Sequence, residues 1–423
     1  MGIKMNILFI VLDCLRTDKL SGETKSSYTP NLDNLLKKST VFTQAIASTS
    51  TTTPSFGSIL TGLYPFNHGI RAHNGYRLNE DCVTLGEILK NNGYSTYAEM
   101  TGPLYLEIGL NRGFDEYCCR ERRKYWDTEW GESLIDRLRN KNYQKPFFLF
   151  LHLFELHHRR RVPKEFDKKK FGKNRYERAL SGIDLFLGEL FKCIDFNDTI
   201  IVLTGDHGEK IHETVFKEYL GDIRKIGRKL IKALGIKSTQ PFINIGHGFQ
   251  VFDYLIRVPL VFYGEKIFPP KKLINDQVRQ VDILPTIVEA LQLKGHKDKI
   301  DGKSLIPLVA GKTESLRYAH CEAVGDTTPN PENWLTAIRT SRYKLIYGLY
   351  NKKIPYQLFD LKNDPEEQYN LAGSHPHVVD ELNQKIVELW PESFKELNPS
   401  RGKMKDDETE MIRQRLKDLG YID

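Results

Sequence analysis

Three uninterrupted apolar runs predict strands that are buried on both faces. They lack the alternation of polar and apolar residues that marks a half-exposed strand, and this is typical of a parallel sheet covered by helices on both sides. The runs are residues 6–12 (NILFIVL), 146–152 (PFFLFLH) and 199–203 (TIIVL). Further strands are predicted at residues 41–45, 95–99 and 258–263.

Apolar residues at helical spacing lie between these strands. One such helix ends at Gly93 and a strand follows at once, which is the helix–glycine–strand order of βαβ units. Residues 115–145 are polar, charged and aromatic, and we expect them to form an excursion at the surface around one helix. The predicted helices are residues 31–38, 54–61, 83–92, 131–139, 174–194 and 281–291.

The character of the chain changes near residue 313. Short strands separated by turns predict a small antiparallel sheet at residues 334–340, 343–347 and 357–360. A charged helical tail follows, and its expected docking residues are Leu416, Leu419 and Tyr421. A chain of 423 residues is long enough for two units. We therefore predict an α/β catalytic domain over residues 1–312 and a C-terminal α+β subdomain over residues 313–423.

The composition is that of an ordinary folded protein, with 40% hydrophobic and 28% charged residues, and it argues against disorder. No apolar run approaches the roughly 18 residues of a membrane span. The N-terminal run is short, ends at Asp13 and lacks a small-residue cleavage site, so we interpret it as a core strand and not as a signal peptide. Six scattered cysteines without CxxC spacing indicate no zinc cage, and a reduced, cytoplasmic protein is expected.

The net charge of +7 is mild, from 62 basic and 55 acidic residues, and no nucleic-acid partner is predicted. Much of the positive charge lies in two basic stretches, residues 157–173 and 224–237. These stretches are either solvated surface or a means of attracting anions. Residues 210–246 resemble a helical basic insertion, which is either a lid packed on the surface or a contact with a membrane surface through residues 212–240.

Polar side chains with acid–base or metal-binding chemistry follow the three buried strands. Asp13 follows the first strand. His152 ends the second strand, and His157 comes five residues later. Asp206 and His207 follow the third strand. A lone Asp in such a place is usually a helix cap, and a lone His is usually structural. Ligands of open α/β sheets bind at the carboxyl ends of the strands, so three such endings together indicate a site.

A hydroxyl-rich stretch, residues 48–70, adds a candidate nucleophile. Pro54 suits the first turn of a helix and Gly62 suits the residue after its end, which places Thr52 and Thr53 at the helix N-terminus. Free N–H groups and the helix dipole favour an anion there. A hydroxyl at this place is either a cap or a nucleophile. The strand endings favour the nucleophile for Thr52.

Oxygen and imidazole ligands without cysteine suit a divalent cation such as Ca²⁺, Mg²⁺, Mn²⁺ or Zn²⁺. Such an ion would hold both the Thr52 hydroxyl and a substrate oxyanion, and it would lower the pKa of the hydroxyl.

In their order along nearly the whole chain, these motifs resemble those of the sulfatases of the alkaline phosphatase superfamily. Asp13 with residues 15–18 resembles the first metal motif, and residues 52–55 and 60–69 resemble the nucleophile signature. The remaining matches are residues 152–157, 204–209, His247 with 257–259, 281–286, 301–305, 358–366 and 419–422.

The resemblance implies an alkaline-phosphatase-like fold, with a large mixed sheet between helices and a small C-terminal α+β subdomain. It implies one divalent ion, with Ca²⁺ favoured, held by Asp13, Asp206 and His207 beside Thr52. The residues implied to face the substrate are His157 and His247 at the oxyanion or leaving group, with His152 and Thr53 nearby. The implied substrate is a small anionic sulfate or phosphate ester, or a sulfated or phosphorylated glycan.

This chain departs from the sulfatase pattern at the site itself. Thr52 stands where sulfatases carry a cysteine or serine that is oxidised to formylglycine, and threonine cannot follow that route. Phe56 replaces an arginine, Cys14 replaces a second acidic metal ligand, and a lysine common near His247 is absent. Threonine nucleophiles occur in relatives that act on phosphodiesters, phosphonates or phospho-alcohol groups.

Three functions are therefore open. The first is a metal-dependent hydrolase that cleaves sulfate or phosphate esters by in-line attack of Thr52. The second is a phosphodiesterase or phosphonate hydrolase, or a transferase that moves a phospho-alcohol group onto a glycan or lipid. The third is a catalytically inactive binding protein, which Phe56 and Cys14 would suit.

Overall fold

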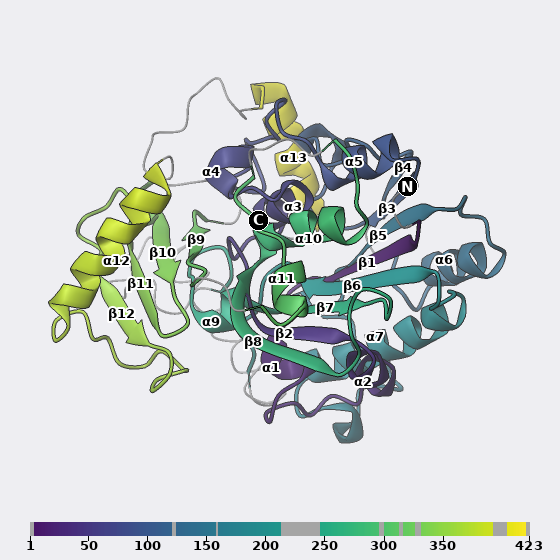
Figure 1. Ribbon diagram of the computed structural model, residues 1–423, viewed down its shortest axis with the longest axis horizontal. Helices are drawn as coiled ribbons and strands as arrows, with labels where there is room; N and C mark the ends of the chain where they lie inside the picture. The colour runs from purple at the N-terminus through teal and green to yellow at the C-terminus, as the bar shows by residue number, and fades with distance from the viewer. Residues whose placement is uncertain are drawn as a thin grey trace, which may run out of the picture.

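A large mixed sheet forms the centre of the molecule (Figure 1). The computed structural model describes residues 4–120, 124–157, 160–212, 246–295, 300–312, 316–325, 331–391 and 404–419. Within these ranges the sheet has eight strands, in the order β4 (Glu116–Cys119), β3 (Ser95–Met100), β5 (Phe147–Leu153), β1 (Asn6–Leu12), β6 (Thr199–Gly205), β7 (Arg257–Tyr263), β2 (Thr40–Ile46) and β8 (Lys272–Arg279). Only β7 runs antiparallel to its neighbours β6 and β2. The predicted mixed α/β fold is confirmed.

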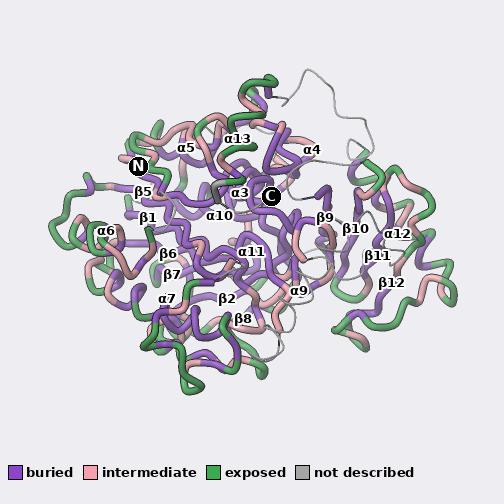
Figure 2. The backbone as a smooth tube through the Cα atoms, turned by 180° about the vertical axis from the view of Figure 1, so that it is seen from behind, coloured by how far each residue is buried: buried purple, intermediate pink, exposed green. Residues whose placement is uncertain are grey.

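The first strand shows why the apolar runs lack polar positions. Ile7, Phe9 and Val11 of β1 lie in one buried cluster, whereas Leu8, Ile10 and Leu12 lie in another. Successive side chains of a strand point to opposite faces, so a sheet covered on both sides needs apolar residues at every position. Figure 2 shows the central strands as buried and the outer loops as exposed.

Helices cover both faces of this sheet (Figure 1). The first cluster includes residues of α3 (Thr52–Thr61), α5 (Leu85–Asn91), α10 (Ile283–Ala290), α11 (Ile306–Val309) and α13 (Asp406–Leu419). The second includes residues of α2 (Pro30–Lys37), α6 (Glu129–Arg139) and α7 (Arg175–Lys192). Short helical turns complete the described part: α1 (Thr17–Leu20), α4 (Pro65–His68), α9 (Asp253–Ile256), η1 (Leu106–Ile108), η2 (Lys169–Phe171), η3 (Gln280–Asp282) and η4 (Pro331–Asn333).

A second, antiparallel sheet lies beside the first and carries α12 (Pro376–Leu389) on its face (Figure 1). Its order is β12 (Gln357–Asp360), β11 (Tyr343–Gly348), β10 (Leu335–Arg339) and β9 (Ala319–Ala323). The three predicted strands are confirmed, and β9 is an addition. The final helix α13 returns to the larger core, where Ile412 and Leu416 are buried. The side chains of Leu419 and Tyr421 lie outside the described residues.

Two edge strands of the large sheet were not predicted. β4 lies within residues 115–145, which the sequence presents as a surface excursion, and most of its residues are exposed. β8 alternates irregularly between buried and exposed residues. Edge strands need little apolar content because one side has no neighbouring strand, so their sequences carry a weak pattern.

The predicted insertion at residues 210–246, with its membrane-contact stretch 212–240, falls almost wholly on residues 213–245, which lie outside the described part. In the helices that are described, no segment combines the length and the apolar character needed to cross a membrane.

Candidate active site

The register of the large sheet brings two acidic residues together. β1 and β6 are parallel neighbours, and Leu12 lies opposite Gly205. The next residues along each strand, Asp13 and Asp206, therefore leave the sheet side by side at its carboxyl edge. Both carboxylates are fully buried.

The two oxygens of Asp206 have different surroundings. Oδ1 accepts hydrogen bonds from the backbone N–H groups of Cys14 (2.9 Å) and His207 (2.7 Å). Oδ2 is buried, accepts no hydrogen bond from the described residues, and lies 3.4 Å from His207 Nε2. Burial raises the pKa of Asp206, and the negative charge of Asp13 raises it further. One oxygen is thus held by the backbone and the other is directed into the site.

Thr52 begins α3 beside these carboxylates. The helix ends as predicted, with Gly62 in the left-handed conformation at φ 69°. The N-cap position belongs to Thr51, whose side chain makes no capping hydrogen bond. The Thr52 hydroxyl instead lies 3.2 Å from His207 Nε2 and 3.5 Å from Asp13 Oδ2. Its position is therefore not that of a helix cap.

Two backbone carbonyls determine which ring nitrogens face the site. His207 Nδ1 lies 2.8 Å from the Gly208 carbonyl, and His152 Nδ1 lies 3.1 Å from the Thr101 carbonyl. A carbonyl only accepts hydrogen bonds, so Nδ1 of each ring carries a proton. The Nε2 lone pairs then point toward the carboxylates, and His152 Nε2 lies 3.5 Å from Asp13 Oδ2.

The converging atoms are nearly all acceptors. They are the carboxylate oxygens of Asp13 and Asp206 and the Nε2 atoms of His152 and His207, with one proton on the Thr52 hydroxyl. Asp13 Oδ1, Asp206 Oδ2 and His152 Nε2 are buried and have no hydrogen-bond partner among the described residues. Unpaired buried carboxylates are costly, and a divalent cation would satisfy them.

Asp13, Asp206 and His207 can each offer a ligand atom within 4.8 Å of the others. The residues therefore fit a divalent cation, and their donor set does not by itself decide which one.

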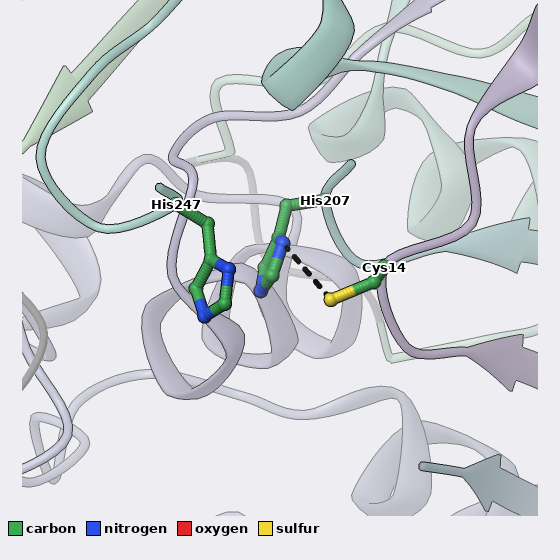
Figure 3. A group of neighbouring side chains, drawn as sticks. All are labelled: Cys14, His207 and His247. Atoms are coloured by element: carbon green, nitrogen blue, oxygen red, sulfur yellow. Dashed lines mark hydrogen bonds between the residues drawn. The ribbon is translucent and has the colours of Figure 1, made fainter. Parts of the chain in front are cut away.

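A second cluster, of Cys14, His207 and His247, fits a cation less well (Figure 3). The rings of His207 and His247 stack with centroids 4.8 Å apart, and Cys14 Sγ lies 3.9 Å from His207 Nδ1. That nitrogen carries the proton donated to Gly208. Burial raises the pKa of the Cys14 thiol well above its usual value, and the charge of Asp13 adds to this. A protonated thiol is a poor ligand.

His157 and His247 lie next to this centre, and their contact with a substrate stays a prediction. The two rings are 5.0 Å apart, and His157 also stacks on Phe154 at 4.5 Å. Burial lowers the pKa of His157 to about 3, so its ring is neutral at physiological pH. Together with His207 the two rings form a row of imidazoles beside Thr52.

The structure also places three residues at the site that the sequence did not assign. Glu209 Oε2 lies 3.3 Å from His247 Nδ1; it belongs to the motif at residues 204–209, so a signal was present. His73 Nδ1 lies 2.6 Å from the Thr53 hydroxyl, and its loop carried no signal. Phe56 packs edge-on against the His152 ring at 4.7 Å, so an apolar contact occupies the position of the expected arginine.

Two family models match this chain. The model described as Sulfatase matches residues 5–293, and that described as N-sulphoglucosamine sulphohydrolase, C-terminal, matches residues 249–392. The first match alone covers more than half of the sequence.

Individual proteins are similar over nearly the full length. The ulvan-active sulfatase of Formosa agariphila is 24% identical, with 91% of this chain and 78% of the relative aligned. The N-acetylgalactosamine-6-O-sulfatase of Bacteroides thetaiotaomicron is also 24% identical, with 90% and 92% aligned. The structure of a phosphonate monoester hydrolase from Silicibacter pomeroyi has a TM-score of 0.70 at 17% identity, with 92% and 95% covered.

Proposed function

The chain belongs to the sulfatase family of sulfuric ester hydrolases, and on that premise we propose that it cleaves a sulfate or phosphate ester with Thr52 as the nucleophile. The observation that carries this proposal is the position of the Thr52 hydroxyl. It lies at the first turn of α3, in contact with Asp13 and His207 and beside a cation site. A helix N-terminus also favours the anionic substrate group.

The chain's own residues suffice to describe the attack. A bond forms between Thr52 Oγ1 and the sulfur or phosphorus, and the bond from that atom to the leaving oxygen breaks. The hydroxyl proton passes to Asp13 Oδ2, and His247 donates a proton to the leaving oxygen. A divalent cation, when held by Asp13, Asp206 and His207, supplies Lewis-acid chemistry that favours the ionised hydroxyl and offsets charge.

Water must complete the cycle, because a threonine ester has no second hydroxyl with which to expel the bound group. Attack by water forms a new bond to sulfur or phosphorus and breaks the bond from that atom to Thr52 Oγ1, and Asp13 returns its proton to Thr52. Glu209, at 3.3 Å from His247, holds the ring that takes up the water proton.

The choice between sulfur and phosphorus gives a second candidate, a phosphodiester or phosphonate hydrolase or a phospho-alcohol transferase. Thr52 supports it, because threonine cannot become formylglycine. The structural likeness to a phosphonate monoester hydrolase fits the same alternative. The names of the ulvan-active and N-acetylgalactosamine sulfatases instead favour a sulfated glycan.

Kinetics of two matched variants test the nucleophile. Thr52→Ala removes the hydroxyl, and we expect kcat/KM to fall by about 10³-fold or more. Thr52→Ser keeps the hydroxyl, so its kcat/KM should fall much less than that of Thr52→Ala. The substrates are p-nitrophenyl sulfate, bis(p-nitrophenyl) phosphate and p-nitrophenyl phenylphosphonate, and the one with the highest kcat/KM identifies the reacting element. Wild-type turnover by Thr52→Ala on all active substrates would overturn the proposal.

A further inference from the structure

We infer that the cation site of this protein selects Zn²⁺ over Ca²⁺, although the resemblance to sulfatases implies Ca²⁺. The inference rests on the cation dependence of the proposed function and adds the chemical class of the ion. Three features of the described residues carry it: the number of oxygen donors, the direction of the imidazole lone pairs, and the residue at position 14.

The site offers few oxygens. Ca²⁺ takes six to eight oxygen ligands, and carboxylates often bind it through both oxygens. Asp206 Oδ1 is already engaged by two backbone N–H groups, and Asp13 Oδ2 lies against Thr52 and His152. Each carboxylate therefore has one oxygen without a hydrogen-bond partner in the described part, Asp13 Oδ1 and Asp206 Oδ2, and one that already accepts a hydrogen bond. With the Thr52 hydroxyl, the set falls well short of a calcium cage.

Imidazole nitrogen supplies the remaining donor. The Gly208 carbonyl holds the proton on His207 Nδ1, so Nε2 presents its lone pair beside Asp206 Oδ2 at 3.4 Å. Imidazole is a ligand of Zn²⁺ and other transition metals, whereas Ca²⁺ and Mg²⁺ prefer oxygen. Two carboxylates and one imidazole match the three protein ligands of a catalytic zinc site, and the fourth place would be left for the Thr52 hydroxyl, water or substrate.

Cys14 removes the oxygen that would favour Ca²⁺. It follows Asp13 directly, is fully buried, and has a positive φ of 61°. Its backbone N–H binds Asp206, but its side chain presents a thiol where the sulfatase pattern has an acidic ligand. Aspartate and asparagine tolerate positive φ better than most residues. Position 14 can therefore accept an added carboxylate without a change of backbone.

Isothermal titration calorimetry on the metal-free full chain tests the ion preference. We expect Zn²⁺ to bind with one-to-one stoichiometry and more than about tenfold tighter than Ca²⁺, because nitrogen donors follow the transition-metal order. The titrations use a Cys118→Ser/Cys119→Ser background, since these exposed thiols would bind Zn²⁺ adventitiously. Asp206→Asn should abolish the one-to-one site, and circular dichroism checks that it folds. Equal or tighter binding of Ca²⁺ to the wild-type site would overturn the inference.

A matched pair at position 14 tests the physical cause. Cys14→Asp adds a carboxylate and should raise the affinity for Ca²⁺. The ratio of the Ca²⁺ dissociation constant to the Zn²⁺ dissociation constant should therefore fall by about tenfold or more. Cys14→Ala adds no donor atom and should leave the ratio near that of the parent. X-ray absorption at the zinc edge should show nitrogen in the ligand shell, and it should lose that nitrogen in His207→Asp. An all-oxygen shell in the parent would contradict the assignment.

The two proposals fail in different ways. Ion preference is measured without substrate, whereas the role of Thr52 is measured by turnover. Zinc selectivity together with an active Thr52→Ala variant would refute the nucleophile and leave the ion assignment standing. Calcium selectivity together with an inactive Thr52→Ala variant would refute the ion assignment and leave Thr52 standing as the nucleophile.

Discussion

Thr52 and Thr53 are neighbours in the sequence, yet their hydroxyls lie in different surroundings. The Thr52 hydroxyl faces Asp13 and His207, whereas the Thr53 hydroxyl lies 2.6 Å from His73 Nδ1 and 3.1 Å from the Pro103 carbonyl. Both side chains are buried. At the scale of single residues, the function of each threonine is thus decided by the partner of its oxygen and not by its place at the helix N-terminus.

Thr53→Val tests this distinction. Valine keeps the shape but removes the hydroxyl, so buried His73 and the Pro103 carbonyl lose a partner. We expect the free energy of unfolding to fall by about 1–3 kcal/mol, the cost of leaving buried polar groups unpaired. The midpoint of urea unfolding measures this loss. Thr53→Ser is the control, because it keeps the hydroxyl and should unfold at a midpoint near that of the wild type. A raised KM with unchanged stability would instead support the predicted contact of Thr53 with substrate.

At the scale of elements, helix α7 holds the loop that carries Asp13, one of the proposed metal ligands. The hydroxyl of Tyr176 donates to the Cys14 carbonyl at 2.9 Å and accepts from the Arg16 N–H at 3.0 Å. Tyr176 is fully buried, and the positive φ of Cys14 lies within the loop that it holds. A helix about 160 residues away along the chain thereby fixes the orientation of Asp13 and of the Cys14 N–H, which binds Asp206.

Tyr176→Phe removes both of these hydrogen bonds and keeps the ring. We expect the affinity for the bound cation to fall by roughly 10–100-fold, as is usual when a residue that orients metal ligands is lost. Calorimetric titration with Zn²⁺ measures this loss. Tyr263→Phe is the matched control, because that hydroxyl binds the Phe196 carbonyl away from the site. An unchanged affinity in Tyr176→Phe would show that the sheet edge alone positions the ligands.

At the scale of the whole molecule, the two sheets are joined by charged groups that water does not reach. Arg71, in a loop of the large unit, forms two hydrogen bonds of 2.6 and 2.7 Å with Glu322 of β9, and its guanidinium lies over the Trp334 ring. Asp253 of α9 pairs in the same way with Arg339 and Lys344 of the second sheet. His73 is two residues from Arg71, so the junction also supports the loop beside Thr53.

Breaking one partner of the Arg71–Glu322 pair should loosen this junction. Arg71→Met leaves the Glu322 carboxylate buried without its partner, and we expect a loss of about 3–5 kcal/mol in the free energy of unfolding. The double variant Arg71→Met/Glu322→Leu should lose less than the single variant, because no unpaired charge remains. Urea unfolding of the wild type, the single variant and the double variant measures both losses of stability. A double variant less stable than Arg71→Met would show that the pair is not the source of the effect.

Much of the fold and of the site could be predicted because both follow from local pattern. Apolar runs marked β1, β5 and β6, and polar residues directly after such runs marked Asp13, Asp206 and His207 at one edge. Pro54 and Gly62 bounded α3 and thereby placed Thr52. These inferences succeed because a buried strand needs apolar residues at every position, and because parallel strands bring their carboxyl ends to one edge.

Local pattern along the chain was therefore enough for the fold class, the resemblance to sulfatases and most residues of the candidate site. The contacts among those residues could be learned only from the folded chain. The Gly208 and Thr101 carbonyls assign the ring protons of His207 and His152, and the register of β1 with β6 places Asp13 beside Asp206. Such facts depend on contacts between residues far apart in the chain, which no local pattern encodes. Among these contacts the Thr52 hydroxyl lies beside Asp13 Oδ2 and His207 Nε2, two acceptors that come from different strand ends.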